Sequence, residues 1–466
     1  MRTLQILVFF LLLLILAACR KQSFITSPDA SISLSNDSIH FDTIFTSTGS
    51  VTQTFKIFNR NNYKLRVNSI ALAGGETSFF QLNADGWPGP EVANIEMNAN
   101  DSLYVFVTVS VDPSQTNLPF IIEDSILISF NGNQHAVKLS AWGQNARFID
   151  SRIVTKDSTW TNEKPIVIRG GVYVLEGAKL TIEKGTRVYL HADAPILVEG
   201  TMEAVGERYD STKIYFSGDR LDRYYRDLPG SWPGIYFREK SRNNILKYAV
   251  LNNAYQGIVV EGPRQNSHPK LSLAECIIDN CYDAGIIAVN SDIVADNCVV
   301  SNCGKNMLLV QGGTYQFSHC TNVAVSNAYV PHQQPVLTLS DFIKEGEQFL
   351  FGSLEASFVN CIFWGSNGIV EDEVVVLKEG TDDFDAEFIN CLWKAETPPS
   401  DITSSGIISN TDPMFEVVEP RDNVYNFRLR EGSPAINAGI NTTLTNDVEG
   451  KPRLGQPDIG AYESIF

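Results

Sequence analysis

The sequence predicts an all-β protein of two units: a sandwich of short strands, followed by a long coil of parallel strands with a cap at its end. Between residues 31 and 146, apolar and polar residues alternate in short runs that are separated by turn signals such as Asn131-Gly132-Asn133. From about Ser151 the apolar runs become shorter and are punctuated by glycine, and cysteine recurs at a fixed spacing. The apolar residues in these runs lack the 3.6-residue period of a helix, so strands are expected throughout.

The composition limits the classes of protein that this chain can belong to. It has 466 residues, of which 43% are hydrophobic and 19% charged. This is enough apolar material to fold, and the length exceeds the roughly 250 to 300 residues at which a single core stops growing. Acidic residues (54) outnumber basic ones (36), which gives a net charge of −18. Such a chain has no basic surplus to displace phosphate counterions, so nucleic acid is not an expected partner.

The N-terminus carries an export signal over residues 1–18. Arg2 is followed by the apolar run Ile6 to Leu16, which is too short to span a bilayer comfortably. The stretch Leu16-Ala17-Ala18-Cys19 resembles the bacterial lipoprotein box, and this resemblance implies cleavage before Cys19 and acylation of that cysteine. We therefore expect the chain to be attached to a membrane through its N-terminal lipid, with residues 19–30 as a tether. The expected location is the cell envelope, at the outer membrane of a Gram-negative bacterium, and the orientation is left open.

Residues 31–146 form the predicted sandwich of about seven strands. Its expected strands are residues 52–58, Leu65 to Leu72, residues 102–111 and residues 124–130. The run Phe55-Lys56-Ile57-Phe58-Asn59, the run Leu103 to Val111 with Asp112-Pro113 after it, and the run Val137 to Gly143 resemble, in this order, the Hydin-like immunoglobulin-fold domains. That resemblance implies an immunoglobulin-like spacer or binding module.

Cysteines mark an internal repeat in the second unit. Cys276, Cys298 and Cys320 are 22 residues apart, as are Cys281 and Cys303. Residues stacked on neighbouring parallel turns are separated by about the strand spacing of ~4.8 Å, which exceeds the roughly 3.5 to 4.5 Å between the Cβ atoms of a disulfide. We therefore expect Cys276, Cys298 and Cys320 to be reduced core residues.

Turns of other lengths continue the same repeat. The offset of 22 places Ile277 over Val299, an offset of 28 places Asn252 over Asn280, and an offset of 30 places Phe358 over Phe388. Repeats that keep their apolar strands while varying in length fit a coil whose loops point outward. The stretch from about Pro165 to Ala395 resembles the right-handed parallel β-helix proteins of the pectin-lyase-like group, and we place the coil at residues 151–395. This resemblance implies the fold and leaves the activity open, because the group includes lyases, hydrolases and adhesins.

The last segment, residues 396–466, contains four motifs, in the order Asp412-Pro413-Met414-Phe415, Gly432-Ser433-Pro434-Ala435-Ile436-Asn437-Ala438-Gly439, Gly450-Lys451-Pro452-Arg453 and Asp458-Ile459-Gly460-Ala461-Tyr462-Glu463. Through these motifs the segment resembles the choice-of-anchor Q domain, which commonly follows β-helix repeats in exported bacterial surface proteins. We expect this segment to cap the last open turn of the coil. Asp447, Arg453, Asp458 and Glu463 are expected to form a fixed polar network that holds the cap.

One loop of the coil contains candidate glycan-binding residues. They are Arg223, Tyr224, Tyr225, Trp232, Tyr236 and Arg238. Aromatic faces and arginine forks suit sugar rings and uronic carboxylates, through stacking and bidentate hydrogen bonds. The alternative is a loop that packs over one side of the coil, with Asp219, Asp222 and Asp227 as local ion-pair partners.

An acidic strand provides the second candidate site. If Phe384, Ala386 and Phe388 point inward, then Asp383, Asp385 and Glu387 share the outer face. The offset of 30 also places Glu355 beside Asp385. Glu355, Asp385 and Glu387 are therefore candidates for a general acid and base pair. Asp383, Asp385 and Glu387 are candidate calcium ligands, and no other cofactor is expected. The alternative is an acidic face in contact with solvent.

The sequence contains no Gly-x-Ser-x-Gly motif, phosphate-binding loop or His-Glu-x-x-His motif. The leading hypothesis is a membrane-anchored, exported lipoprotein that binds a glycan or a surface without catalysis. One alternative is a polysaccharide lyase or glycoside hydrolase that acts on a face of the β-helix, and another is a purely architectural surface protein. The oligomeric state and the glycan are left open.

Overall fold

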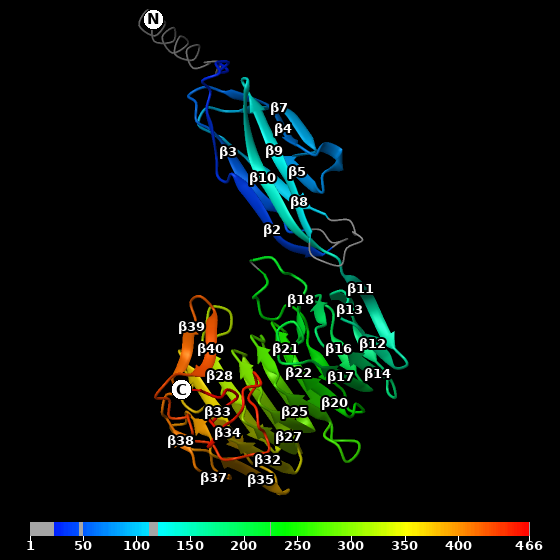
Figure 1. The fold of residues 1–466 in the computed structure, drawn as a ribbon, viewed down its shortest axis with the longest axis vertical. Coiled ribbons are helices and arrows are strands. Elements are labelled where there is room, and N and C mark those ends of the chain that lie inside the picture. The colour runs from blue at the N-terminus through cyan, green and yellow to red at the C-terminus, as the bar shows by residue number, and fades with distance from the viewer. Residues whose placement is uncertain (1–22, 46–49, 111–119, 224, 466) are drawn as a thin grey trace, which may run out of the picture. The chain divides into compact units, whose positions relative to one another are not determined.

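The computed structural model of the chain describes residues 23–45, 50–110, 120–223 and 225–465. The predicted leader, Cys19 and Tyr224 lie outside the described residues. Contacts divide the chain into two units, Met1–Asn145 and Ala146–Phe466. The described secondary structure is strand throughout, apart from one 3-10 turn at Gly75–Thr77, which confirms the all-β fold class (Figure 1). No helix among the described residues is long and apolar enough to cross a bilayer.

The first unit is a sandwich of two five-stranded sheets, with the strand orders β1-β3-β8-β5-β6 and β2-β10-β9-β4-β7. Neighbouring strands are antiparallel, except that β10 pairs with β2 in parallel. The strands are β1 (Ile32–Leu34), β2 (Ser38–Phe45), β3 (Gln53–Asn59), β4 (Leu65–Leu72), β5 (Phe80–Ala84), β6 (Trp87–Pro88), β7 (Glu91–Met97), β8 (Ser102–Val109), β9 (Phe120–Phe130) and β10 (Asn133–Gln144). Their inward residues form one apolar core, so the predicted sandwich is confirmed, although its described part has ten strands and not about seven.

The second unit is a coil in which one continuous sheet of 26 strands winds along three parallel faces. We name these the capped face, the tyrosine face and the polar face. The capped face consists of β15 (Arg187–Leu190), β18 (Ile214–Gly218), β21 (Ala249–Asn252), β24 (Ile277–Asp279), β26 (Val299–Ser301), β28 (Thr321–Val325), β33 (Ile362–Ser366), β36 (Leu392–Trp393) and β38 (Ile408–Ser409). The tyrosine face consists of β16 (Ile196–Val198), β19 (Ile235–Phe237), β22 (Gln256–Glu261), β29 (Leu337–Ser340) and β34 (Val374–Leu377).

The polar face consists of β12 (Ser158–Trp160), β14 (Lys179–Ile182), β17 (Thr201–Val205), β20 (Asn244–Lys247), β23 (Leu271–Ala274), β32 (Leu354–Val359), β35 (Phe384–Ile389) and β37 (Thr403–Ser405). Four longer strands bend from one face to the next: β11 (Arg147–Val154), β13 (Ile166–Val174), β25 (Ala284–Asp296) and β27 (Lys305–Ser318). Two hairpins lie outside the coil: β30 (Phe342–Glu345) with β31 (Gln348–Phe351), and β39 (Phe415–Glu419) with β40 (Val424–Leu429). The rungs continue to Ser409, beyond residue 395, where we expected the coil to end.

The strand register confirms two of the three predicted offsets. Ile277 pairs with Val299, and Phe358 pairs with Phe388. The apolar rows that result form a core running through the whole coil.

The third predicted offset, 28, is wrong by one residue at Asn280, which does not stack on Asn252. Asn252 pairs with Asp279, and it is Asn253 that stacks on Asn280, whose Nδ2 donates to Asn253 Oδ1 at 2.7 Å. Asn253 and Asn280 both have a positive φ, 64° and 56°. Asparagine tolerates this left-handed conformation better than most residues, so the corner of the coil selects the stacked pair. The extra residue therefore falls after the corner, and from Gln256 onward the offset is 28 as predicted, which places Ile258 over Ile286.

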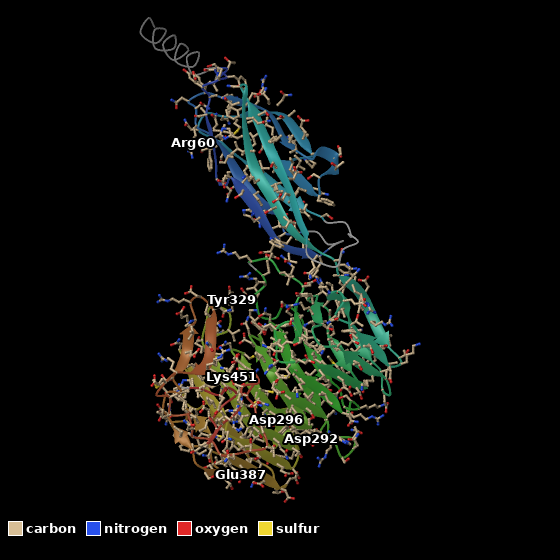
Figure 2. All side chains as sticks on the ribbon, viewed as in Figure 1. Arg60, Asp292, Asp296, Tyr329, Glu387 and Lys451 are labelled. Atoms are coloured by element: carbon tan, nitrogen blue, oxygen red, sulfur yellow. The ribbon has the colours of Figure 1, made fainter. Side chains whose placement is uncertain are left out.

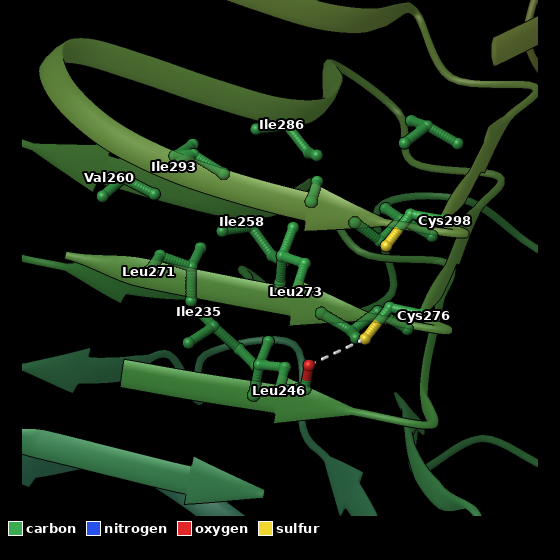
Figure 3. Close-up of a cluster of buried hydrophobic side chains, with 14 of the residues drawn as sticks. Ile235, Leu246, Ile258, Val260, Leu271, Leu273, Cys276, Ile286, Ile293 and Cys298 are labelled. Atoms are coloured by element: carbon green, nitrogen blue, oxygen red, sulfur yellow. Dashed lines mark hydrogen bonds between the residues drawn. The ribbon is translucent and has the colours of Figure 1, made fainter. Parts of the chain in front are cut away.

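The seven described cysteines are buried free thiols. Cys276 and Cys298 lie one rung apart at the same corner of the coil, and Cys276 Sγ donates to the carbonyl of Leu246 at 3.2 Å (Figure 3). Burial raises the pKa of both thiols well above its usual value. The predicted role of Cys276, Cys298 and Cys320 as reduced core residues is confirmed.

The C-terminal segment lies along the side of the coil and not over its last turn, which corrects our expectation. Its apolar residues Phe415, Phe427 and Ile459 pack on the outward side chains of the capped face, such as Ile362. From the end of the coil the segment runs back along this face, and Asn360 Nδ2, on an earlier rung, donates a hydrogen bond to the carbonyl of Ile440. The strand of the last rung, β37, stays exposed. The physical reason is that the outward side of the capped face is apolar, whereas β37 presents threonine and serine.

The predicted polar network of this segment is confirmed. Arg453 Nη1 lies 3.0 Å from Glu463 Oε2, and their side chains are only 2% and 5% exposed. Asp447 accepts hydrogen bonds from the backbone N–H of Lys451, and Asp458 from that of Asn437. Arg453 also donates to Asn297 of the coil at 2.8 Å. These four charged residues therefore hold the segment's own turns together and fasten it to the capped face.

A buried lysine fastens the loop that precedes β23. The ammonium of Lys270 donates to the carbonyls of Glu239 at 2.7 Å and Gly262 at 3.1 Å, and also to the carbonyl of Glu261. The residue is 1% exposed, and burial lowers its pKa to about 8.

We expect Lys270→Met to lower the free energy of unfolding by about 1 to 3 kcal/mol, because three partly buried carbonyls lose their donor. Urea denaturation measures the loss. Lys240→Met is the control, since Lys240 is exposed and its ammonium contacts only the exposed Glu176. Equal urea midpoints for the two variants would contradict the proposed role of Lys270.

His319 lies at a corner of the coil, where it has a positive φ, and we expect its burial to make the free energy of unfolding depend on pH. Its side chain is fully buried, and its Nε2 accepts a hydrogen bond from Asn360 Nδ2 at 2.9 Å. Burial, with the positive charge of Arg453, lowers the pKa of His319 from 6.5 to about 3. Below pH 6.5 the unfolded chain therefore binds a proton that the native state does not bind.

Stability should fall as the pH drops through this window, by on the order of 1 kcal/mol per pH unit from His319 alone. We expect His319→Asn to remove this part of the slope, and asparagine also suits the φ of 52° at this corner. Denaturation of both proteins at several pH values between 5 and 7 measures the slopes. Identical slopes would show that His319 is not the group that titrates.

Candidate functional site

The predicted glycan-binding loop is divided between the core and the surface. Trp232 is fully buried in the coil, and its Nε1 donates to the carbonyl of Asn252 at 2.9 Å. It therefore has no free face for a sugar ring, which removes it from the candidate set. Tyr236 lies on β19 with its ring on the tyrosine face, and its hydroxyl donates to the carbonyl of Pro233 at 3.1 Å.

The arginines of this region have carboxylate partners. Arg220 pairs with Asp222 at 3.1 Å, and its guanidinium lies 4.1 Å from the ring centroid of Tyr225. Arg238 Nη1 lies 2.6 Å from Glu261 Oε1. Arg226 similarly pairs with Asp227, whereas Asp219 pairs with His191. Arg223 is exposed in the same loop. The ion-pair interpretation of the loop is thus supported for Asp222 and Asp227.

The structure places two exposed tyrosines together beside Tyr236. Tyr255 and Tyr282 are 46% and 56% exposed, and their rings stack with centroids 5.7 Å apart and an interplanar angle of 24°. Burial raises the pKa of Tyr236, and its neighbours Tyr255 and Asp283 add to this rise. We call Tyr236, Tyr255 and Tyr282 the tyrosine cluster.

Fixed polar groups lie next to the tyrosine cluster. Asp283 accepts hydrogen bonds from Lys305 Nζ at 2.7 Å and from Gln256 Nε2 at 2.8 Å. Burial opposes ionisation of Asp283, but the hydrogen bonds from Lys305 and Gln256 outweigh it and lower the pKa of this carboxyl. The site therefore offers a charged acceptor, an amide and an amine in fixed positions beside exposed aromatic rings.

An apolar row continues from the cluster along the tyrosine face. Leu197, Tyr236, Val259, Ile287 and Leu308 follow one another in strand register. Their inward neighbours form the core, so these five side chains point outward, and all but Val259 are partly exposed. With about 4.8 Å between rungs, the row makes a flat strip that could contact an extended chain.

Our sequence alignment missed Tyr255, Tyr282, Asp283 and Lys305. Because we aligned Asn252 with Asn280, Tyr255 did not fall over Tyr282. The correct pairing of Asn253 with Asn280 has an offset of 27, which places Tyr255 over Tyr282 as well. The signal was present in the sequence, but only the register of the corner reveals it.

The acidic residues Glu355, Asp383, Asp385 and Glu387, which we call the acidic ladder, have the predicted geometry. Ala386 and Phe388 are buried, Phe384 packs against the core, and Glu355 pairs with Asp385 in register on the outer side of the polar face. Glu387 lies on the same strand at the end of the coil that holds β37 (Figure 2), with Ser357 and Thr403 as its register partners. Asp383 is exposed just before β35.

Within the described parts of the chain, no group of three or more His, Cys, Asp or Glu residues is arranged to hold a metal ion. Calcium binding by Asp383, Asp385 and Glu387 stays a prediction, as does acid–base chemistry by Glu355, Asp385 and Glu387.

The pairing of Glu355 with Asp385 leads to a stability prediction. Like charges directly opposite each other on neighbouring strands repel, so Asp385→Asn should stabilise the coil by about 0.5 kcal/mol at low salt and by less at high salt. Thermal melting at two salt concentrations measures the effect. Glu387→Gln is the matched control, because its register partners carry hydroxyls. Loss of a calcium-dependent stabilisation in Asp385→Asn would instead indicate a bound cation and contradict net repulsion.

Comparison with known proteins agrees with the coil and leaves the activity open. A family model described as a right handed beta helix region matches residues 109–329. No curated protein matches the sequence.

Similar solved structures include a family 123 glycoside hydrolase from Clostridium perfringens that hydrolyses glycolipid glycans (8% identity, TM-score 0.19), with 26% of this chain and 30% of that chain covered. Others are the CooA pilin subunit of enterotoxigenic Escherichia coli (9% identity, TM-score 0.19, 25% and 98% covered) and the Salmonella enterica SafA pilin in complex with the SafB chaperone (13% identity, TM-score 0.18, 26% and 57% covered). The chain thus spans about 30% of the length of the glycoside hydrolase. At these TM-scores the likenesses carry no argument about function.

Proposed function

We propose that this protein is an exported surface lipoprotein that binds a glycan, without catalysis, at the tyrosine cluster of its β-helix. The observation that carries the proposal is the exposed, stacked pair of Tyr255 and Tyr282 beside the hydrogen-bonded group of Gln256, Asp283 and Lys305. Aromatic faces contact the C–H faces of sugar rings, and fixed polar groups bind the hydroxyls. The apolar row on the tyrosine face extends this surface over several rungs.

The charges around the cluster favour a neutral glycan over a uronic acid polymer. Arg220, Arg238 and Lys305 each have a carboxylate partner within the protein. Binding a glycan carboxylate would require these ion pairs to be exchanged, and the net charge of −18 repels polyanions. The proposed ligand therefore differs from the uronic acid that the arginines of the loop suggested.

The proposal includes the location expected from the sequence. The lipoprotein box at Cys19 supports acylation and attachment to the outer membrane of a Gram-negative bacterium. The motifs of residues 31–146 and 396–466 support an immunoglobulin-like spacer and a choice-of-anchor Q domain. In this arrangement the lipid retains the protein in the envelope while the β-helix binds the glycan.

We expect Tyr255→Ala and Tyr282→Ala each to weaken binding to a neutral polysaccharide by about three- to tenfold, because each removes a stacking face. Affinity electrophoresis through gels that contain galactomannan, hydroxyethyl cellulose or soluble starch measures the dissociation constants. Tyr329→Ala is the control, since Tyr329 is 40% exposed and lies outside the cluster. Equal retardation of all three variants would contradict a site at the tyrosine cluster.

The same polysaccharides distinguish binding from catalysis. The protein should leave their chain length unchanged in size-exclusion chromatography. Shortened chains that disappear with Glu355→Gln or Asp385→Asn would contradict the non-catalytic proposal and support an enzyme that uses the acidic ladder.

A further inference from the structure

The sandwich has a surface depression of about 480 Å³ that is separate from the β-helix and has no role in the proposed function. Its lining includes Phe106 and Thr108 of β8, Gln81 and Asn83 of β5, and Thr52 just before β3. This volume is within the range of small-ligand sites, roughly 300 to 1,000 Å³.

The strand register explains why these side chains gather on the outside of the sandwich. Phe106 pairs with Asn83, and Thr108 pairs with Gln81, so the four residues form two neighbouring rows across β8 and β5. The residues between them on β8, such as Val107, are fully buried. Alternation along the strands therefore turns an aromatic ring, two amides and a hydroxyl toward solvent.

The groups in the depression are available to a ligand. Phe106 is 39% exposed. The side chains of Gln81, Thr52 and Thr108 make no hydrogen bond to another residue that the structure describes, and Asn83 uses only its Oδ1, which accepts from Gly86 N–H at 2.9 Å. An apolar ring thus lies among amide and hydroxyl groups that have free donors and acceptors.

The charge of the depression narrows the class of ligand. Glu76 is the only ionisable residue among the described residues of its lining, and these provide no cation for an anionic ligand. The neighbouring aromatic Tyr104 lies outside the lining, with Lys56 Nζ 4.4 Å from its ring centroid and its ring stacked on that of Phe106 at a centroid distance of 5.9 Å. Phe106 therefore supplies the open ring face, next to neutral polar groups.

We propose that this depression is a second binding site, for a neutral saccharide, that acts independently of the tyrosine cluster. A sugar ring pairs an apolar C–H face with hydroxyls, which matches Phe106 together with Gln81, Asn83 and Thr108. An extended peptide is the competing ligand, because β6 pairs with β5 only at Asn83 and Ala84, with one further bond from Gly89 N–H to the carbonyl of Leu82, and no described strand lies beside Phe80 and Gln81 on that side. The side-chain amides and hydroxyls in the lining favour the saccharide.

The test uses the full-length chain in detergent, with the tyrosine cluster disabled by Tyr255→Ala and Tyr282→Ala together. We expect this protein to retain weaker binding to at least one of galactomannan, hydroxyethyl cellulose and soluble starch in affinity electrophoresis. Adding Phe106→Ala, or Gln81→Ala as a variant that leaves the aromatic ring in place, should raise the remaining dissociation constant about three- to tenfold. Tyr63→Ala is the control, because it removes an aromatic side chain of the sandwich that is 54% exposed and lies outside the depression.

The outcomes are distinct. If the cluster-disabled protein binds none of the three polysaccharides, the sandwich site is overturned while the tyrosine cluster stands. Residual binding that Phe106→Ala and Gln81→Ala leave unchanged also overturns it, as does residual binding that Tyr63→Ala weakens equally. Competition by an unstructured peptide, without any saccharide binding, would assign the depression to peptide recognition and overturn the proposal. Unchanged melting temperatures show that the variants are folded.

Discussion

The structure of the second unit depends on one constraint: each rung of the coil pairs its backbone with the rungs before and after it, in parallel and in register. This places equivalent residues over one another at about the strand spacing. A side chain that fits one rung therefore fits the next, and the interior becomes a set of columns such as Ile258 over Ile286 over Met307. The corners of the coil also repeat from rung to rung. Glu275, Asn297 and His319 all have a positive φ, and each lies just before a buried cysteine.

This register constrains the side chains that fill the interior, but it leaves the outward-pointing side chains of each rung free to vary. The three faces of the coil therefore differ in their outward residues. The capped face is apolar enough to need covering, and the C-terminal segment covers it through Phe415, Phe427 and Ile459. The polar face carries hydroxyls and carboxylates that water satisfies. The tyrosine face lies between these extremes, with an apolar row and hydrogen-bonded polar groups beside it. Any specific function of the coil depends on these outward-pointing side chains, because the apolar core is similar in every rung.

The sandwich obeys a related rule with a period of two. On β8 the inward valines fill the core, and the outward positions are free to hold Tyr104, Phe106 and Thr108. Because the sandwich presents its ligand-type residues Gln81, Asn83, Phe106 and Thr108 on regular strands, the backbone holds these side chains with little freedom. Such rigid surfaces lose little conformational entropy when they bind.

The amino-acid sequence was enough to predict the all-β class, the sandwich, the repeat, the reduced cysteines and the pairing of Glu355 with Asp385, because these follow from local alternation and from offsets within regular strands. The burial of Trp232, the stacking of Tyr255 on Tyr282 and the position of the C-terminal segment became known from the folded structure. Each of these depends on a corner or a loop, where one residue more or less rotates every following side chain and no period remains to indicate its direction. The position of the C-terminal segment also depends on an apolar surface to which many rungs contribute outward-pointing side chains. No single segment of the sequence contains that surface.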